Sequence, residues 1–157
     1  MTPNQAQDMA AKLATQPPPP SASFLLSYPA QHVLLVTINR EHAMNSIPTQ
    51  AHWDAEAIFS WFDSEPSLRV AIITGAGEKA FCAGQDLIEQ AMFKDDPPPM
   101  SARRHPPSGF CGISRRTGLK PVLAAVNGFA LGGGFEISLN WLVKSSPSSG
   151  PCITCCY

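Results

Sequence analysis

The sequence KPVLAAVNGFALGGGFEISLN, residues 120–140, decides how the rest of the chain is interpreted. Its first part is a short apolar run between Pro121 and the pair Asn127-Gly128, which is typical of a buried β-strand. Three consecutive glycines, Gly132–Gly134, lead from there into residues with helical spacing. Glycines let another group approach the backbone closely, and a helix start presents unpaired N–H groups and the positive end of its dipole. We therefore predict that this stretch stabilises an anionic or carbonyl oxygen of a ligand.

Clusters of proline divide the chain, whose 157 residues are enough for one ordinary domain. Nine of the 16 prolines gather at residues 17–20, 97–99 and 106–107. Such runs favour extended segments that do not join a core. We predict a flexible, proline-rich leader over residues 1–23, with the domain beginning at residue 24.

The charge balance argues against two classes of partner. The chain has 11 basic and 12 acidic side chains and a formal net charge of −1, so we predict no attraction to nucleic acid or to an anionic membrane. No apolar run is long enough to cross a bilayer, and the first residues lack the apolar core of a secretory signal. We predict a soluble, intracellular protein, and the sequence does not distinguish mitochondrion, peroxisome and cytoplasm.

The five cysteines do not predict a disulfide framework, because their number is odd and three of them lie in the last six residues. Cys152 and Cys155 have the C-x-x-C spacing of a redox or zinc site. No second pair of cysteines or histidines accompanies them. We predict no metal site and interpret these cysteines as part of an unstructured tail.

Strands and helices are expected to alternate through the central part of the chain. Aliphatic and β-branched runs predict buried strands at residues 33–39 and 69–74, besides the strand at 122–126. Shorter helices are expected at residues 86–93 and 109–118. The alternation indicates an α/β fold with partly parallel strands and ligand contacts at their carboxyl ends.

One longer helix is predicted from Pro48 to Phe62, because proline suits the first turn and apolar residues follow at helical spacing. The residues expected to form its buried stripe are Trp53, Ala57, Ile58, Trp61 and Phe62. Their aromatic side chains are interpreted as core rather than as a cofactor site.

The glycine-bearing loop GAGEKAFCAGQDL has two interpretations. Gly75, Gly77 and Ala80 have the G-x-G-x-x-A spacing of a dinucleotide-binding turn, and Asp95 or Asp96 lies near the distance expected of a ribose-binding acid. In a dinucleotide-binding unit the helix begins inside the glycine motif, whereas here the first helical stretch comes later. We therefore prefer the second interpretation, a loop that precedes a helix.

Asp86 is the expected N-cap of that helix, since aspartate is a favoured residue at this position. Such a cap fixes the preceding turn, so that the backbone of Gly84 and Gln85 faces a ligand. Four arginines farther along have two open interpretations, solvated side chains or contacts with phosphate groups. They are Arg103, Arg104, Arg115 and Arg116. We favour the solvated interpretation.

Three blocks of the sequence together resemble a known family. The blocks NREHAMNS, VAIITGAGEKAFCAGQDL and KPVLAAVNGFALGGGFEISLN, within about residues 30–140, are similar in order and spacing to the enoyl-CoA hydratase/isomerase (crotonase) superfamily. The resemblance implies a crotonase-like spiral of ββα repeats, the ClpP/crotonase fold. It also implies an acyl-CoA thioester as substrate, with coenzyme A as part of that substrate and no separate cofactor, and assembly as trimers or pairs of trimers.

The resemblance assigns roles to particular residues. Backbone N–H groups of Gln85 and Gly133 correspond to the oxyanion hole that stabilises the enolate formed from the thioester. Glu136 corresponds to a glutamate that positions and activates water, and its alternative role is to complement the helix dipole. The positions that correspond to coenzyme A contacts are His42, Ala43, Met44, Ala80, Ala83, Gly84, Gln85, Asp86, Leu87, Ile88 and Gly133.

The chain departs from the family pattern after SLN, where it continues as WLVKSSPSSGPCITCCY. No Asp or Glu follows Glu136, so the second catalytic acid of the family has no counterpart, and the crotonase-like domain is expected over residues 24–143 with a disordered tail at 144–157. We expect impaired or no hydratase activity, and we do not carry the family's oligomer over to this chain. The alternatives are a non-catalytic fragment that binds acyl-CoA or associates with subunits and, more remotely, a dinucleotide-binding oxidoreductase.

Overall fold

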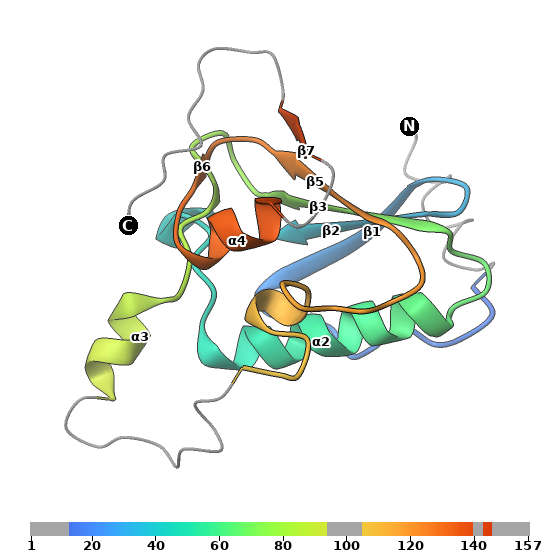
Figure 1. The fold of residues 1–157 in the computed structure, drawn as a ribbon, viewed down its shortest axis with the longest axis horizontal. Helices are drawn as coiled ribbons and strands as arrows, with labels where there is room; N and C mark the ends of the chain where they lie inside the picture. Colours follow the sequence, from blue (N-terminus) through green and yellow to red (C-terminus); the bar gives the residue numbers. More distant parts are fainter. Residues whose placement is uncertain (1–12, 94–104, 140–142, 146–157) are drawn as a thin grey trace.

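The computed structural model describes residues 13–93, 105–139 and 143–145, and its main element is a five-stranded sheet (Figure 1). The strand order is β1-β2-β3-β5-β7. β1 and β2 are antiparallel, and every other neighbouring pair is parallel. The strands are β1 (Phe24–Ala30), β2 (Val33–Ile38), β3 (Val70–Gly75), β5 (Val122–Val126) and β7 (Val143–Ser145).

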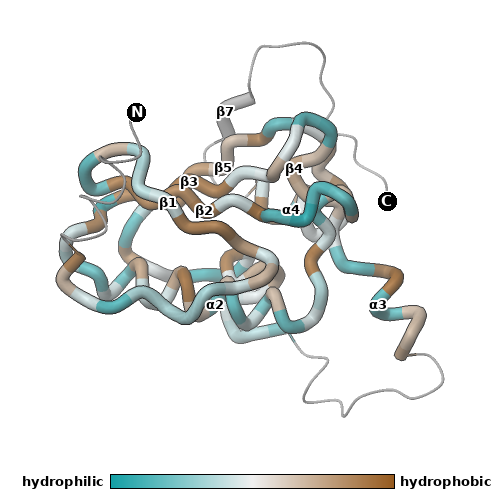
Figure 2. The backbone as a smooth tube through the Cα atoms, turned by 180° about the vertical axis from the view of Figure 1, so that it is seen from behind, coloured by the Kyte–Doolittle hydropathy of each residue, from teal (hydrophilic) through white to brown (hydrophobic). Residues whose placement is uncertain are grey.

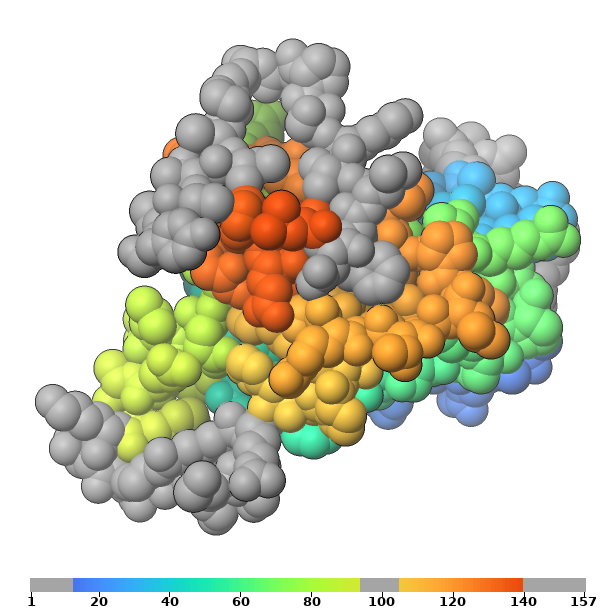
Figure 3. Space-filling model, in the orientation of Figure 1, coloured from blue at the N-terminus to red at the C-terminus, as the bar shows by residue number. Residues whose placement is uncertain are grey.

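Helix α2 (Thr49–Ser64) connects β2 to β3 and runs along one face of the sheet (Figure 1). The remaining described helices are short: η1 (Glu41–Ala43), α3 (Leu87–Met92), η2 (Phe110–Gly112) and α4 (Gly133–Leu139). In Figures 1 and 3, α3 stands out at one end of the described molecule, away from the sheet. The strands at 33–39, 69–74 and 122–126 and the helices at 48–62 and 86–93 were all predicted, with ends that differ by one or two residues.

The core lies between the sheet and α2. Side chains alternate between buried and half-buried along the central strands, because successive residues of a strand point to opposite faces. The buried strand residues, which join Ile58, Phe59 and Phe62 of α2 in one cluster, include Leu34, Val36, Ile38, Ala71, Ile73, Val122 and Ala124. Figure 2 shows these strands as the hydrophobic centre of the molecule.

The predicted buried face of α2 is partly wrong. Ile58, Trp61 and Phe62 are buried as expected, but Trp53 is 40% exposed and Ala57 is also exposed. The helix instead buries Ala51, His52, Ala55, Ile58, Phe59, Trp61 and Phe62. The face was assigned from large aromatic residues, whereas the side of α2 that is buried includes Ala51, His52 and Ala55 and leaves Trp53 outside.

Two very short strands form a second sheet that the sequence analysis did not predict. β4 (Ala80–Cys82) pairs in parallel with β6 (Phe129–Ala130). The loop GAGEKAFCAGQDL therefore leads from β3 into a strand, and no helix begins at its glycine motif, which contradicts the dinucleotide interpretation. The helix expected at 109–118 is also wrong, since only the three residues of η2 are helical.

The described part of the predicted leader contacts α2. Ala14 and Thr15 donate main-chain hydrogen bonds to the buried carboxylate of Glu65, and Ser21 donates to Asp54. Residues 1–12 and 146–157, which include Cys152 and Cys155, lie outside the described residues. The division into leader, domain and tail thus stays a prediction.

Within residues 13–93, 105–139 and 143–145, no helix has the length and apolar character required to cross a membrane. The same ranges hold no group of three or more histidine, cysteine or acidic side chains arranged to bind a metal ion.

Candidate active site

One loop follows β4 and another follows β6. Because these two strands are parallel, both loops begin at the same end of the pair, where the strands' carboxyl ends lie. The first contains Ala83–Asp86 and the second Leu131–Gly133; we call them the oxyanion loops. The N–H of Leu131 donates to the carbonyl of Cys82, at 3.0 Å. A Cβ atom added at Gly84 would lie 2.9 Å from the Leu131 carbonyl oxygen and 3.4 Å from the Gly133 nitrogen. The two loops are therefore in direct contact, as the predicted site requires.

The N–H groups of Gln85 and Gly133 are unpaired within the described part of the chain. The next N–H along each loop is paired: Asp86 donates to the Ile47 carbonyl at 3.0 Å, and Gly134 donates to the Leu131 carbonyl at 2.9 Å. Gln85 and Gly133 are both half-buried, and backbone donors that are withdrawn from water are usually paired. Two unpaired donors on touching loops are thus suited to an oxygen atom supplied by a ligand.

Each of the three consecutive glycines, Gly132–Gly134, is required for a different structural reason. Gly132 has a φ of 50° and makes the turn into α4. A Cβ at Gly133 would lie 2.4 Å from the ring of Phe110, and one at Gly134 would lie 2.1 Å from the Cys82 carbonyl oxygen. The backbone at both positions rests so closely on its neighbours that no side chain fits.

The loop with the first predicted coenzyme A contacts lies beside the first oxyanion loop. Met44 accepts a hydrogen bond from the Ala83 N–H at 3.0 Å, and Ile47 donates to the Gly84 carbonyl at 2.8 Å. His42 is exposed, while Ala43 and Met44 are half-buried. The structure therefore brings together the two predicted segments, 42–44 and 80–88, although their contact with a ligand stays a prediction.

Asn45 organises this junction and was not among the predicted site residues. Its side chain is fully buried, and its Nδ2 donates to the carbonyls of Ala76 and Ala80 at 2.9 and 2.7 Å. Its φ is 56°, a left-handed conformation that asparagine tolerates better than most residues. An asparagine in the loop NREHAMNS was the available signal.

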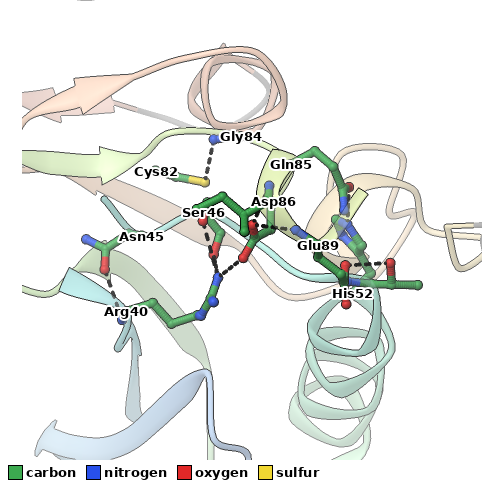
Figure 4. Close-up of polar contacts among 11 residues, drawn as sticks. Arg40, Asn45, Ser46, His52, Cys82, Gly84, Gln85, Asp86 and Glu89 are labelled. Atoms are coloured by element: carbon green, nitrogen blue, oxygen red, sulfur yellow. Dashed lines mark hydrogen bonds and ion pairs between the residues drawn. The ribbon is translucent and has the colours of Figure 1, made fainter. Parts of the chain in front are cut away.

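Asp86 is the N-cap of α3, as predicted, and accepts from the N–H groups of Ile88 and Glu89. It also forms an ion pair with Arg40, whose Nη1 lies 2.8 Å from Asp86 Oδ2 and 2.7 Å from the Ser46 carbonyl oxygen (Figure 4). Burial acts to raise the pKa of Asp86, but the hydrogen bonds and charge of Arg40 and the two cap hydrogen bonds hold this pKa below its usual value. The ionised Asp86 thus joins the two predicted segments.

Glu136 lies in the first turn of α4 and is exposed. Its carboxylate makes no hydrogen bond or ion pair within the described residues. Leu87 and Ile88, at the start of α3, are 71% and 70% exposed. These three side chains stand at the surface near the helix starts, where a ligand has access to them.

His52, on α2, contacts the site and was missed. Figure 4 shows the Gln85 side chain directed from its loop toward His52, and the His52 Nε2 lies 2.7 Å from the Gln85 Oε1. Burial lowers the pKa of His52 to about 4, and the hydrogen bond to Gln85 offsets only part of this effect. The signal was a histidine at helical spacing with Ala55 and Phe59, which the prediction based on Trp53 did not include.

The arginines for which we predicted either solvation or phosphate contacts differ in their surroundings. Arg115 is exposed, whereas Arg116 is paired with Asp63 through two nitrogens and donates to the Lys120 carbonyl at 3.1 Å. These contacts commit Arg116 to the packing of α2. Arg103 and Arg104, like Asp95 and Asp96, lie outside the described residues.

Comparison with known proteins shows the family to which the chain belongs. The family model for enoyl-CoA hydratase/isomerase matches residues 29–140. The mevalonyl-coenzyme A hydratase of Beauveria bassiana is 48% identical over 130 residues, which are 80% of this chain and 46% of that protein. The mevalonyl-coenzyme A hydratase of Aspergillus fumigatus is 41% identical over 128 residues, 82% of this chain and 46% of that protein.

A solved structure shows the same arrangement. A probable enoyl-CoA hydratase/isomerase from Mycobacterium abscessus superposes with a TM-score of 0.66 and 35% identity, over 82% of this chain and 47% of that one. The chain thus spans about half the length of the relatives it matches. The predicted crotonase-like fold is confirmed, and the chain belongs to the enoyl-CoA hydratase/isomerase family.

Proposed function

We propose that the chain binds acyl-CoA thioesters and stabilises negative charge on the thioester oxygen with the N–H groups of Gln85 and Gly133. The observation that carries this proposal is the pair of unpaired N–H groups on two touching loops. Donors that are fixed before the reaction stabilise charge as it develops, and losing one such donor costs about 3 to 4 kcal/mol of transition-state stabilisation.

The proposed reaction is the addition of water to an enoyl-CoA. The water oxygen bonds to the β-carbon, the electron pair of the carbon–carbon double bond moves through the α-carbon to the thioester oxygen, and an enolate forms. The water gives one proton to Glu136, and the enolate collapses as the α-carbon takes this proton from the protonated carboxyl group, which regenerates the carboxylate. Glu136 is the proposed group that orients the water and accepts its proton, because its carboxylate is accessible and lies one turn after Gly133.

The coenzyme A portion is proposed to lie along residues 42–44 and 80–88, which the Arg40–Asp86 ion pair and the hydrogen bonds of Asn45 hold together. The residues that would contact the acyl group are less well defined than those proposed for the coenzyme A portion. Two relatives are mevalonyl-coenzyme A hydratases, so mevalonyl-CoA is a compound to test beside crotonyl-CoA. It already carries a hydroxyl on its β-carbon, so it would react in the reverse direction, by loss of water.

A second function is a non-catalytic chain that binds acyl-CoA or associates with full-length relatives. One observation favours it. The backbone of Gln85 and Gly133 is held by the hydrogen bonds and packing of the oxyanion loops, whereas the exposed carboxylate of Glu136 has no hydrogen bond or ion pair within the described residues to fix it. Oxyanion donors beside an acid that is not held in place would support binding with little or no turnover.

One experiment separates these functions. Purified protein is titrated with crotonyl-CoA by calorimetry, and hydration is followed by loss of the enoyl absorbance, with Glu136→Gln as the variant. Saturable binding with turnover that Glu136→Gln abolishes supports the enzyme, and saturable binding without turnover supports the binding chain. Absence of saturable binding would contradict both. Addition of a full-length relative to the purified chain, followed by size-exclusion chromatography, tests subunit association.

A further inference from the structure

Three aromatic rings form a cluster behind the oxyanion loops: His52 from α2, and His105 and Phe110 from the segment that leads into η2. The ring centroid of His52 lies 4.4 Å from that of His105 and 4.7 Å from that of Phe110. The contact between His52 and Phe110 is edge-to-face. His105 and Phe110 are 5.7 Å apart, also edge-to-face. Such contacts stabilise fixed ring orientations.

The cluster reaches the first oxyanion loop through hydrogen bonds. The N–H of Cys111 donates to the His52 Nδ1 at 3.0 Å, so the hydrogen of the neutral imidazole lies on Nε2. Nε2 therefore donates to the Gln85 Oε1, 2.7 Å away, and the Nε2 of His105 lies 3.4 Å from the same oxygen. These contacts hold the side chain of Gln85, the residue whose backbone N–H is unpaired within the described residues.

The same cluster reaches the second oxyanion loop through packing. A Cβ atom at Gly133 would lie 2.4 to 2.6 Å from three atoms of the Phe110 ring, so the Gly133 backbone rests directly on that ring. Phe110 is followed by Cys111, whose N–H is bonded to His52. One buried histidine therefore connects, by two short routes, to both residues that carry the unpaired N–H groups.

We propose that His52 is a positioning residue that sets the relative placement of the Gln85 and Gly133 N–H groups through Gln85 Oε1 and Phe110. This inference rests on the proposed function. Oxyanion donors act only when they lie about 2.7 to 3.1 Å from the charged oxygen, and a misplacement of about 1 Å costs on the order of a hundredfold in rate. The hydrogen bonds that flank Gln85 fix its neighbours Gly84 and Asp86, and the His52 contact holds Gln85 itself.

Two substitutions separate the hydrogen bonds of His52. In His52→Asn the amide oxygen occupies a place similar to Nδ1, so the bond from Cys111 is kept and the bond to Gln85 is lost. In His52→Gln the amide nitrogen reaches toward the place of Nε2, so the bond to Gln85 is kept. The control is His32→Asn, since His32 bonds to the Ser67 carbonyl through its Nδ1 at 2.6 Å and has a φ of 66°, which asparagine tolerates.

The readout is the infrared stretching band of the thioester carbonyl of crotonyl-CoA, labelled with carbon-13 at that carbon, together with the Kd and a thermal melt. Wild type, His32→Asn and His52→Gln are expected to shift the band of bound crotonyl-CoA to lower frequency. His52→Asn is expected to lose at least half of this shift and to raise the Kd about tenfold, while it melts close to His52→Gln. A purely structural role would change the melt and leave the band of the bound ligand at its wild-type position.

A second variant tests the inference without altering the buried ring. Gln85→Met keeps the backbone N–H but removes Oε1, so it is expected to lose the shift as His52→Asn does. A full shift in His52→Asn or in Gln85→Met overturns the positioning role and leaves the proposed function intact. Wild-type protein that binds no crotonyl-CoA, or binds it with no shift, overturns the proposed function and the inference with it.

Discussion

The Oε2 atom of Glu89 accepts hydrogen bonds from both the main-chain N–H and the hydroxyl of Thr49, at 2.7 and 2.8 Å. Thr49 is the first residue of α2, and the residue before it, Pro48, provides no side-chain cap. An acid from α3 therefore caps α2, where its charge complements the positive end of the helix dipole. This contact also holds α3, which buries none of its own residues.

Glu89→Ala is expected to lower the free energy of unfolding by about 1 to 2 kcal/mol, because α2 loses its cap and its interaction with the dipole. Urea unfolding measures the change. Gln90→Ala, at the next and exposed position of α3, is the matched control and is expected to have little effect. Equal destabilisation by the two substitutions would show that Glu89 acts through α3 alone.

Two glycines of the oxyanion loops separate backbone strain from obstruction of the site. Gly84 and Gly132 both have positive φ, 92° and 50°. Alanine at either position is strained, at a cost of about 1 kcal/mol. A methyl group at Gly132 meets no atom within 4 Å, whereas one at Gly84 lies 2.9 Å from the Leu131 carbonyl oxygen and 3.4 Å from the Gly133 nitrogen.

We therefore expect Gly84→Ala to weaken crotonyl-CoA binding about tenfold or more, and Gly132→Ala to lower stability with a smaller effect on binding. Calorimetric titration and urea unfolding of both variants test this. Binding that tracks stability alone across the pair would contradict a ligand position between the two loops.

The elements predicted correctly from the sequence are those with a strong period. β2, β3 and β5 alternate between buried and half-buried residues, and such a pattern extends over enough residues to be recognised. β4 and β6, with three and two residues, are too short to have a period. They exist because they pair with each other, and that pairing was not visible in either segment alone.

Some residues of the candidate site were also predicted from the sequence, and others were missed. Gln85 and Gly133 were identified from motifs that resemble a family, and the structure places their loops in contact. His52 and Asn45 were missed because their importance lies in hydrogen bonds to residues 33 and 35 positions away in the chain. Long-range polar contacts of this kind have no local signature, and the prediction that included Trp53 left His52 out of the buried face of α2.

The buried imidazole of His52 predicts that stability falls as the pH decreases below neutral. Burial lowers its pKa from 6.5 to about 4, with a smaller effect of the same sign from His105 and opposing effects from Gln85 and Glu89. Between these two pKa values the unfolded chain binds a proton that the folded chain does not. The contribution of the neutral His52 to the free energy of unfolding is therefore fully present above pH 6.5. It is lost progressively toward pH 4, by up to about 3 kcal/mol.

Urea unfolding of wild type and His52→Gln at pH 7 and pH 5 measures this contribution. The wild type is expected to lose more stability than the variant between the two pH values, because glutamine does not titrate. Parallel pH profiles would contradict a neutral His52 in the folded protein.

Glu65 predicts a second loss of stability at lower pH. Its buried carboxylate accepts from the N–H groups of Ala14, Thr15 and Ser67, at 3.0, 2.7 and 2.9 Å, and from the hydroxyls of Thr15 and Ser67. Burial acts to raise its pKa, but these hydrogen bonds outweigh burial and lower the pKa from 4.5 to about 2. The carboxylate thus contributes stability above pH 4.5, and this contribution is lost as the pH falls through about 2, below the range of His52.

Glu65→Gln is expected to lower the free energy of unfolding by about 3 kcal/mol at pH 7, because the amide places donors against the donors of residues 14, 15 and 67. The variant is also expected to lose the pH dependence between pH 4.5 and 2 that the wild type shows. Glu78→Gln, at an exposed loop position, is the control and should match the wild type in both measurements. If Glu65→Gln also matched the wild type, residues 13–15 would not be held beside α2 through this carboxylate in solution. Their remaining contacts with the core would be the hydrogen bond from the Trp61 indole N–H to the Thr15 hydroxyl, at 2.9 Å, and the packing of Leu13.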